Sequence, residues 1–334
     1  MKLASMKHGG RDGTLVVVNR ALEHAVAVPQ IANTLQQALD DWQSLAPQLA
    51  KVSAALEAGQ CATACAFAPG AAASPLPRSF QFLDGSVYLH HMEKARRARG
   101  VAMPPNHTIE PLMYQGLSDT FGGPCDAMRC VSADLEIDYE AEVAIITDDV
   151  PMGVTVAAAA SHIKLIMLLN DWTARALTRS ELPKGFGFVQ SKPASAFSPV
   201  AVTPDELGAA WDGARLCLPL HSAVNGTALG CPNAGVDMFF TYPELIAHAA
   251  RTRALGAGTI IGAGAVSNRD PATGHGCIAE ARVDEQDAYA AARTPWLRDG
   301  DVVRIEMFDA QGASVFGAIE QRLAVTPGPN SFAD

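Results

Sequence analysis

The stretch from Asp138 to Ile146 constrains this chain more than any other. It reads Asp-Tyr-Glu-Ala-Glu-Val-Ala-Ile-Ile, and its apolar, β-branched second half favours a β-strand. Residues two apart in a strand share a face, which places Glu140 and Glu142 together, about 6.5 Å apart along the chain. Burying two unpaired carboxylates so close together is costly. Either the strand face is solvated, as for most isolated Glu-x-Glu pairs, or a hard divalent cation with oxygen ligands relieves the cost.

A third carboxylate changes the balance between these two interpretations. The uninterrupted apolar run from Ile163 to Leu169 has the length of a buried strand. It stops abruptly at Asn170-Asp171-Trp172, and a carboxylate at the end of a buried strand indicates a functional site. Asp171 therefore joins Glu140 and Glu142 as a predicted ligand of one divalent ion.

The remaining pattern predicts a mostly β protein of the α+β class. Helical spacing is expected at 31–42, around 49–56, at 94–99, at 156–160 and at 242–253. Strands are expected at 14–18, 163–169, 215–223, 258–266, 301–308 and 315–323. Helices do not alternate with strands, which argues against a doubly wound sheet. The basic run from Lys94 to Arg99 is interpreted as a solvated helix face.

The length of 334 residues favours one large domain plus a smaller one. A segment rich in small residues and Pro, from Gly70 to Arg78, is the predicted linker. The expected division is a small N-terminal domain over 1–75, a catalytic domain over 76–326 and a disordered tail over 327–334.

Composition limits the partners and the compartment. The formal net charge of −10 argues against nucleic acid as a partner. The seven cysteines show no paired metal-ligand spacing, so reduced thiols in the cytoplasm are expected. No signal peptide is recognisable, and no apolar run reaches the length of a transmembrane helix, so no membrane association is expected.

The chain resembles the fumarylacetoacetate hydrolase family in four segments that follow the family's order and spacing: Glu140-Ala141-Glu142, Asn170 to Arg175, Lys192, and Gly258-Thr259-Ile260-Ile261. The resemblance extends over about residues 78–325, and the first 75 residues resemble the small N-terminal domain of fumarylacetoacetases. It implies a C-terminal mixed β-roll that holds Mg²⁺ or Ca²⁺, with Mn²⁺ also possible. It further implies a small barrel-like N-terminal domain and a homodimer.

The resemblance also implies roles for individual residues. Glu140, Glu142 and Asp171 match the family's metal ligands. Fumarylacetoacetases add a further metal-binding Asp seven residues before a catalytic His. Asp84 and His91 have this spacing, which implies Asp84 as a fourth metal ligand and His91 as the catalytic His.

Three further positions follow from the same match. Glu280 stands about where the family's His-pairing glutamate lies, and Tyr114 resembles a substrate-binding Tyr. Arg175 and Lys192 are fixed positive charges for an oxyanion or a substrate carboxylate. The structural alternative is that these two are ordinary surface ion-pair partners.

The implied activity is hydrolysis of a carbon–carbon bond in a β-diketone or acylpyruvate-type acid, a reaction on ketonic substances. The metal would act as a Lewis acid on the diketone oxygens, and His91 would take a proton from water. Fumarylacetoacetate, from aromatic amino-acid catabolism, is the leading substrate. Two alternatives stay open: a decarboxylase, hydratase or tautomerase of 2-oxo acids, and a non-catalytic metal-binding β protein.

Three positions depart from the family pattern and bear on the substrate pocket. The family's Gly-Thr pair is Gly264-Ala265 here, and the Gln of fumarylacetoacetase after the Arg is Thr178. The family has a Tyr two residues after the Asp that corresponds to Asp84, and this chain has Ser86 there. These changes leave the predicted metal ligands and the His91–Glu280 pair in place.

Overall fold

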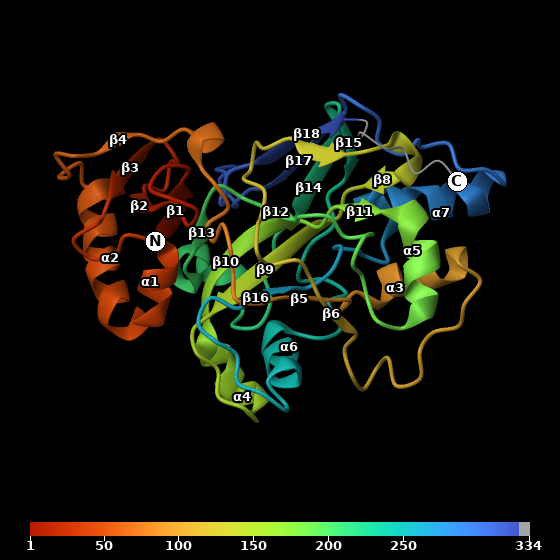
Figure 1. Cartoon of the computed structure of the whole chain (residues 1–334), viewed down its shortest axis with the longest axis horizontal. Helices are drawn as coiled ribbons and strands as arrows, with labels where there is room; N and C mark the ends of the chain where they lie inside the picture. Colours follow the sequence, from red (N-terminus) through yellow and green to blue (C-terminus); the bar gives the residue numbers. More distant parts are fainter. Residues whose placement is uncertain (327–334) are drawn as a thin grey trace.

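A large central sheet organises the computed structural model, which describes residues 1–326 (Figure 1). The sheet has eleven strands, ten of them on one path, and β12 (Ala196–Phe197) pairs beside β10. The order along the path is β4 (Cys65–Ala66), β3 (His24–Ala27), β2 (Thr14–Val18), β1 (Lys2–Met6), β13 (Ala201–Val202), β10 (Ile163–Asn170), β9 (Ala141–Thr147), β16 (Ile260–Gly262), β5 (Phe82–Gly85) and β6 (Met113–Gln115).

Two smaller sheets complete the β-structure. A two-stranded sheet joins β11 (Thr173–Ala174) to β8 (Ile137–Asp138). A five-stranded sheet has the order β15 (Thr227–Gly230), β14 (Leu220–Val224), β17 (Val302–Met307), β18 (Ile319–Val325) and β7 (Met128–Cys130).

The helices are mostly short. They are α1 (Leu35–Asp40), α2 (Trp42–Glu57), α3 (Leu89–Ala98), α4 (Val156–Ala159), α5 (Arg175–Glu181), α6 (Tyr242–Ala249) and α7 (Ile278–Tyr289). Short 3₁₀ segments lie at Pro69–Ala71, Ala133–Leu135, Ala160–His162, Leu182–Lys184, Pro204–Ala210 and Pro271–Thr273. In Figure 1, α1 and α2 flank the N-terminal strands, and α3, α5 and α7 lie at the opposite end of the molecule.

The apolar run that was predicted as a buried strand is β10, and it is buried on both faces. Ile166 and Leu168 belong to one apolar core, while Leu165, Met167 and Leu169 belong to a second core on the opposite face. Because side chains alternate along a strand, a strand between two cores has no position that favours a polar residue. The prediction of a mostly β, α+β fold is confirmed by the three sheets and the few short helices.

The expected barrel-like form of the N-terminal domain was wrong. Within residues 1–326 the N-terminal strands do not close on themselves, and they extend the central sheet through β1, whose Lys2 pairs with Val202 of β13. Helix α1 also begins later than predicted, because the side chain of Thr34 accepts a hydrogen bond from Gln37 N and caps the helix there. The predicted disordered tail lies outside the described residues.

The pattern had predicted one strand from Asp138 to Ile146, but the structure has two strands there. Its first part is β8 and its second part is β9, which belong to different sheets. Between them the buried Tyr139 donates a hydrogen bond to Ser222 Oγ (2.9 Å), and Glu140 bridges to Cys277. The chain passes from one sheet to the other at Tyr139, so Glu140 and Glu142 have different neighbours.

Candidate active site

Three buried carboxylates meet near the centre of the large sheet. Asp84 stands on β5, Glu142 on β9, and Asp171 follows the last residue of β10. One oxygen from each lies within 4.8 Å of the others, and all three side chains are buried. The sheet order explains the meeting, because β10 and β9 are neighbours and only β16 separates β9 from β5.

A glycine on the intervening strand makes room for this cluster. Gly262 of β16 pairs with Asp84 on one side, and a Cβ placed there would lie 2.2 Å from Asp84 Oδ1. Two residues on, Gly264 has a φ of +90°, and its N–H donates to Asp84 Oδ1 (3.2 Å) and to Glu142 Oε2 (3.1 Å). The sequence Gly262-Ala263-Gly264 therefore brings a backbone donor, rather than a side chain, against the carboxylates.

The cluster has the electrostatics of a cation site. Burial and the neighbouring carboxylates raise the pKa of both Asp84 and Glu142 well above the ordinary carboxyl range. Glu142 Oε1 is buried without a hydrogen-bond partner among the described residues. Leaving a buried polar oxygen unpaired is costly, and a divalent ion with oxygen ligands would remove that cost. The three carboxylates therefore fit a hard divalent metal.

Glu140 lies beside this cluster but is held differently from the prediction. Lys192 Nζ contacts both Glu140 Oε2 and Asp171 Oδ2 at 2.5 Å, and Arg175 Nη2 donates to Glu140 Oε1 (2.8 Å). Burial alone would raise the pKa of Glu140, but Lys192 and Arg175 outweigh it and hold the pKa well below its usual range. Of the four predicted ligands, the structure brings Asp84, Glu142 and Asp171 within 4.8 Å of one another, and Glu140 is not part of that group.

The predicted catalytic pair is in contact. His91 Nδ1 lies 2.7 Å from Glu280 Oε1, and His91 Nε2 lies 3.9 Å from Glu140 Oε1. Burial opposes the charge on Glu280, yet the hydrogen bond and charge of His91 keep the pKa of Glu280 below its ordinary value. The adjacent His90 contacts Ser267 Oγ instead (3.1 Å). Of the two neighbouring histidines, His91 is the one aimed at the carboxylates.

Asp138 is a site residue that the sequence interpretation missed. Its buried carboxylate accepts from Arg175 Nε (2.9 Å) and from the backbone N–H groups of Ile278 (2.9 Å) and Ala279 (3.0 Å). The last two groups lie at the start of α7, so Asp138 fixes the beginning of the helix that carries Glu280. The sequence did offer a signal for Asp138: it lies two residues before Glu140, and residues two apart in a strand share a face.

A cavity of about 660 Å³ opens over these groups. It is lined by all the predicted site residues except the buried Glu142 and Asp171, and also by the three departures from the family pattern: Ser86, Thr178 and Ala265. Tyr114 donates its hydroxyl hydrogen to Asp171 Oδ2 (2.6 Å), and its ring packs edge-on against Phe188, 4.8 Å between centroids.

The far wall of the cavity carries arginines. Arg96, Arg99 and Arg282 line it and form no ion pair with any carboxylate of residues 1–326. Arg96 Nε is buried without an acceptor there. Burial, and next the charges of Arg96 and Arg175, lower the pKa of Arg99. The basic run from Lys94 to Arg99 had been interpreted as a solvated helix face. That interpretation was wrong for its inner side, where Arg96 and Arg99 present to the cavity positive charge that has no ion-pair partner among the described residues.

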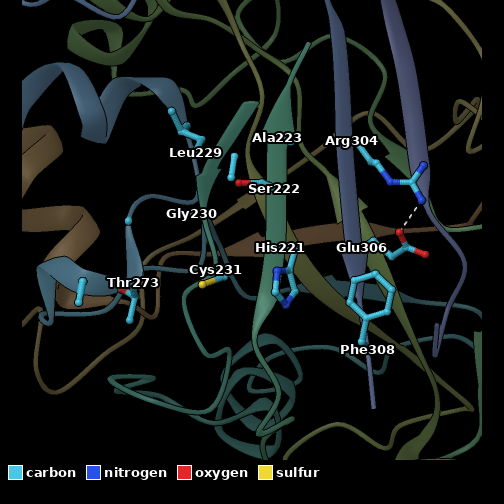
Figure 2. Close-up of a pocket in the computed structure, with 13 residues that line it drawn as sticks. His221, Ser222, Ala223, Leu229, Gly230, Cys231, Thr273, Arg304, Glu306 and Phe308 are labelled. Atoms are coloured by element: carbon cyan, nitrogen blue, oxygen red, sulfur yellow. Dashed lines mark hydrogen bonds and ion pairs between the residues drawn. The ribbon is translucent and has the colours of Figure 1, made fainter. Parts of the chain in front are cut away.

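A second cavity, of about 380 Å³, lies over the five-stranded sheet (Figure 2). His221 of β14 and Phe308 stand near each other in it, 5.4 Å between ring centroids. Arg304 there is already paired with Glu306 (2.5 Å), as Figure 2 shows. None of the predicted site residues lines this cavity.

Divalent metal should stabilise the protein more at high pH than at low pH. Asp84 and Glu142 have raised pKa values in the folded, metal-free protein. The folding stability that comes from their protonation is therefore fully present below the ordinary carboxyl pKa of about 4. It is lost as pH rises through the raised values, and a bound ion cancels that loss. The gain in Tm on adding Mn²⁺, measured by differential scanning fluorimetry, should be larger at pH 8 than at pH 5. Equal gains at the two pH values would contradict this, and Glu142→Gln should reduce the gain at pH 8.

Family comparisons cover nearly the whole described chain. The family model for the fumarylacetoacetate hydrolase C-terminal region matches residues 81–324, and that for fumarylacetoacetase N-terminal domain 2 matches residues 1–78. Among curated proteins none matches the chain. No helix of residues 1–326 is long and apolar enough to cross a membrane.

Solved structures share the fold at low sequence identity. Fumarylacetoacetate hydrolase from Exiguobacterium antarcticum is 19% identical, with a TM-score of 0.63 and coverage of 98% of this chain and 100% of that chain. Maleylpyruvate hydrolase from Sphingobium sp. SYK-6, in complex with manganese(II) and pyruvate, is 17% identical, with a TM-score of 0.62 and coverage of 97% and 99%. A 5-carboxymethyl-2-hydroxymuconate delta-isomerase from Mycobacterium smegmatis is 16% identical, with a TM-score of 0.56 and coverage of 98% and 99%.

Proposed function

Because the chain belongs to the fumarylacetoacetate hydrolase family, we propose that it is a metal-dependent hydrolase that cleaves the carbon–carbon bond of a β-diketone or acylpyruvate-type acid. The observation that carries the proposal is that the His91–Glu280 pair lines the same cavity as Asp84, one member of the buried carboxylate cluster. A histidine whose second nitrogen is held by a carboxylate has the arrangement of a general base.

The carboxylate end of the cavity supplies the proposed metal site. Asp84, Glu142 and Asp171 would hold the ion, with Glu140 as a fourth proposed ligand. Mg²⁺ or Ca²⁺ is proposed, and Mn²⁺ is possible because a structure of the same fold holds manganese(II). Bound there, the ion would polarise the substrate carbonyls and stabilise negative charge on their oxygens.

The protein side chains then account for the movement of protons. His91 Nδ1–H donates to Glu280, which leaves Nε2 free to accept a proton from water. The hydroxide so formed adds to one carbonyl carbon, the bond to the adjacent CH₂ carbon breaks, and that carbon leaves with the electron pair as an enolate. The proton on His91 is available to return to this carbon, which yields a carboxylic acid and a ketone. Lys192 is close enough to the carboxylates to balance charge during these steps.

The arginine wall supports a dicarboxylic acid as the substrate. Arg96, Arg99 and Arg282 face the cavity without an ion-pair partner in the described part of the chain. A guanidinium binds a carboxylate through its paired N–H groups, so a second carboxylate on the substrate would fit this wall. Fumarylacetoacetate has carboxylates at both ends and remains the leading candidate.

An isomerase or tautomerase acting on a 2-oxo acid is the second candidate function. Its support is the shared fold with a 5-carboxymethyl-2-hydroxymuconate delta-isomerase. Such a reaction moves a proton within the substrate and needs no activated water. The water activation proposed for the His91–Glu280 pair would therefore not be required. A non-catalytic metal-binding role has support only from Ala265 and Thr178, the departures from the family pattern.

A substrate panel tests the proposal. Purified protein is assayed with diketo acids and 2-oxo acids in the presence of Mg²⁺, Mn²⁺ or Ca²⁺, and each diacid is paired with its analogue lacking the distal carboxylate. We expect carbon–carbon cleavage of a diketo diacid, with a kcat/KM at least about tenfold above its mono-acid analogue, since a hydrogen bond to a charged group contributes about 1.5–3 kcal/mol. Tautomerisation or decarboxylation without cleavage would favour the second candidate.

A further inference from the structure

Helices α3 and α7 are joined by a row of three charged pairs, which we call the α3–α7 ladder. From the inside outward, His91 pairs with Glu280 (2.7 Å), Lys94 with Asp284 (2.8 Å) and Arg97 with Asp287 (2.6 Å). The members are three apart on α3 and four or three apart on α7, the spacing that brings residues of successive turns to one side of a helix. The catalytic pair of the proposed function is thus the innermost rung of a longer row.

Taken as pairs, the rungs become more exposed from the inside outward, although Lys94 is slightly more buried than His91. The side chains of the inner rung are 13% and 2% exposed, those of the middle rung 9% and 38%, and those of the outer rung 58% and 54%. Exposed ion pairs contribute little to stability, so the outer rung holds the helices weakly. The middle rung is different, because removing Asp284 would leave the nearly buried ammonium of Lys94 without a partner.

The two helices offer little apolar surface to each other. The buried residues of α3 are Met92 and Lys94, and those of α7 are Ile278, Glu280 and Ala281. No side chain caps the first turn of α3, which follows Tyr88 directly. Most helices in proteins are held by an apolar face, so this packing depends on the polar pairs to an unusual degree.

A second histidine lies between the inner and middle rungs. His275 Nδ1 lies 3.9 Å from Glu280 Oε2 and 3.8 Å from Asp284 Oδ2, and it is buried without a hydrogen-bond partner in residues 1–326. Its backbone is anchored, since its N–H donates to Leu229 O (3.2 Å). Asp284 therefore stands in the same polar cluster as Glu280, although it does not contact His91.

We propose that Lys94 and Asp284 are positioning residues, which hold α3 against α7 so that His91 meets Glu280 in the orientation needed for proton transfer. This inference rests on the proposed function. The side chain of Lys94 is engaged by Asp284 rather than by the carboxylate cluster. Lys94 also lines the cavity, so a direct contact with substrate would appear in KM, whereas an effect through the position of His91 would appear in kcat.

The test compares Lys94→Met and Asp284→Asn with the wild-type enzyme at one pH. A misplacement of about 1 Å can cost up to about 10²-fold in rate, so we expect kcat to fall about tenfold while KM changes less than about twofold. The double variant should fall no further than either single one, because both remove the same pair. Lys94→Arg should retain most of the activity. Arg269→Met is the matched control: it removes another ion pair of α3, the exposed one between Arg269 and Glu93 (3.0 Å), and should leave kcat unchanged.

A measurement on the resting protein separates this inference from the proposed function. The His91 Nδ1–H proton, held by Glu280, should give a downfield NMR signal that is assigned by its absence in His91→Asn. Lys94→Met should weaken or broaden this signal, and Lys94→Arg and Arg269→Met should preserve it. If no diketo acid is turned over, the proposed function fails, but the NMR comparison still decides the positioning role. A wild-type signal and kcat in Lys94→Met, a rise in KM alone, or a loss of Tm that Lys94→Arg does not restore would overturn the inference.

Discussion

Removal of divalent ions from the purified protein is expected to reduce turnover to background, and added Mg²⁺ or Mn²⁺ to restore it. The reason lies in the buried carboxylates Asp84, Glu142 and Asp171, whose oxygens meet within 4.8 Å and include Glu142 Oε1, which has no hydrogen-bond partner among residues 1–326. Without an ion these groups repel one another, and the substrate oxygens have no Lewis acid. The measurement is turnover of a diketo acid after dialysis against EDTA and then with each metal.

Two variants sharpen this first prediction. Glu142→Gln keeps the shape of the side chain but removes a charge from the cluster, so it should weaken metal affinity by at least about 10-fold in calorimetry, since mutation even of a partner behind a metal ligand costs about that much. Glu320→Gln is the control, since this carboxylate lies on β18, pairs with Arg304 and is half-exposed. Full activity after exhaustive chelation would contradict the metal requirement.

Replacement of His91 by Asn should lower kcat by about 10²- to 10⁴-fold, the usual contribution of general-base catalysis. Metal affinity should remain at the wild-type level, because the imidazole is not a proposed ligand and His91 Nε2 lies 3.9 Å from Glu140. Glu280→Gln should lose less activity in the same direction, since this residue orients the ring through a 2.7 Å contact without taking the proton itself.

The neighbouring histidine provides the control for this second prediction. His90 contacts Ser267 rather than Glu280, so His90→Ala should keep most of the wild-type kcat. Loss of activity in His90→Ala with retention in His91→Asn would show that the general base had been assigned one residue too late. Wild-type rates in both variants would mean that water is activated without either histidine, and would favour the isomerase alternative.

The sequence allowed prediction of those features that depend on local pattern. The apolar run of β10 predicted a buried strand, and the abrupt Asn170-Asp171 ending predicted a functional carboxylate at its end. The pairing of His91 with Glu280, 189 residues apart, came from family resemblance and from no local pattern. The structure places them together, and their catalytic roles remain predictions.

The remaining features depend on contacts between distant segments. The break between β8 and β9 follows from the contact of Tyr139 with Ser222 and from the capping of α7 by Asp138. Helix α7 was not predicted, because its apolar residues show no clear helical face and its buried side chains include Glu280. Arg96 and Arg99 of the arginine wall were missed because a basic helix looks the same in sequence whether it faces solvent or a cavity. Arg282 was missed together with α7.

Cleavage in water enriched with ¹⁸O tests the central claim most directly. If the protein is a carbon–carbon bond hydrolase, one ¹⁸O atom should appear in the carboxylate of the acid product at the rate of substrate loss, and the label should vanish with turnover in His91→Asn. Mass spectrometry of the two products gives this result within one experiment. Substrate consumed without ¹⁸O in a carboxylic acid product, as carbon dioxide or as an isomer of unchanged mass, would contradict the account.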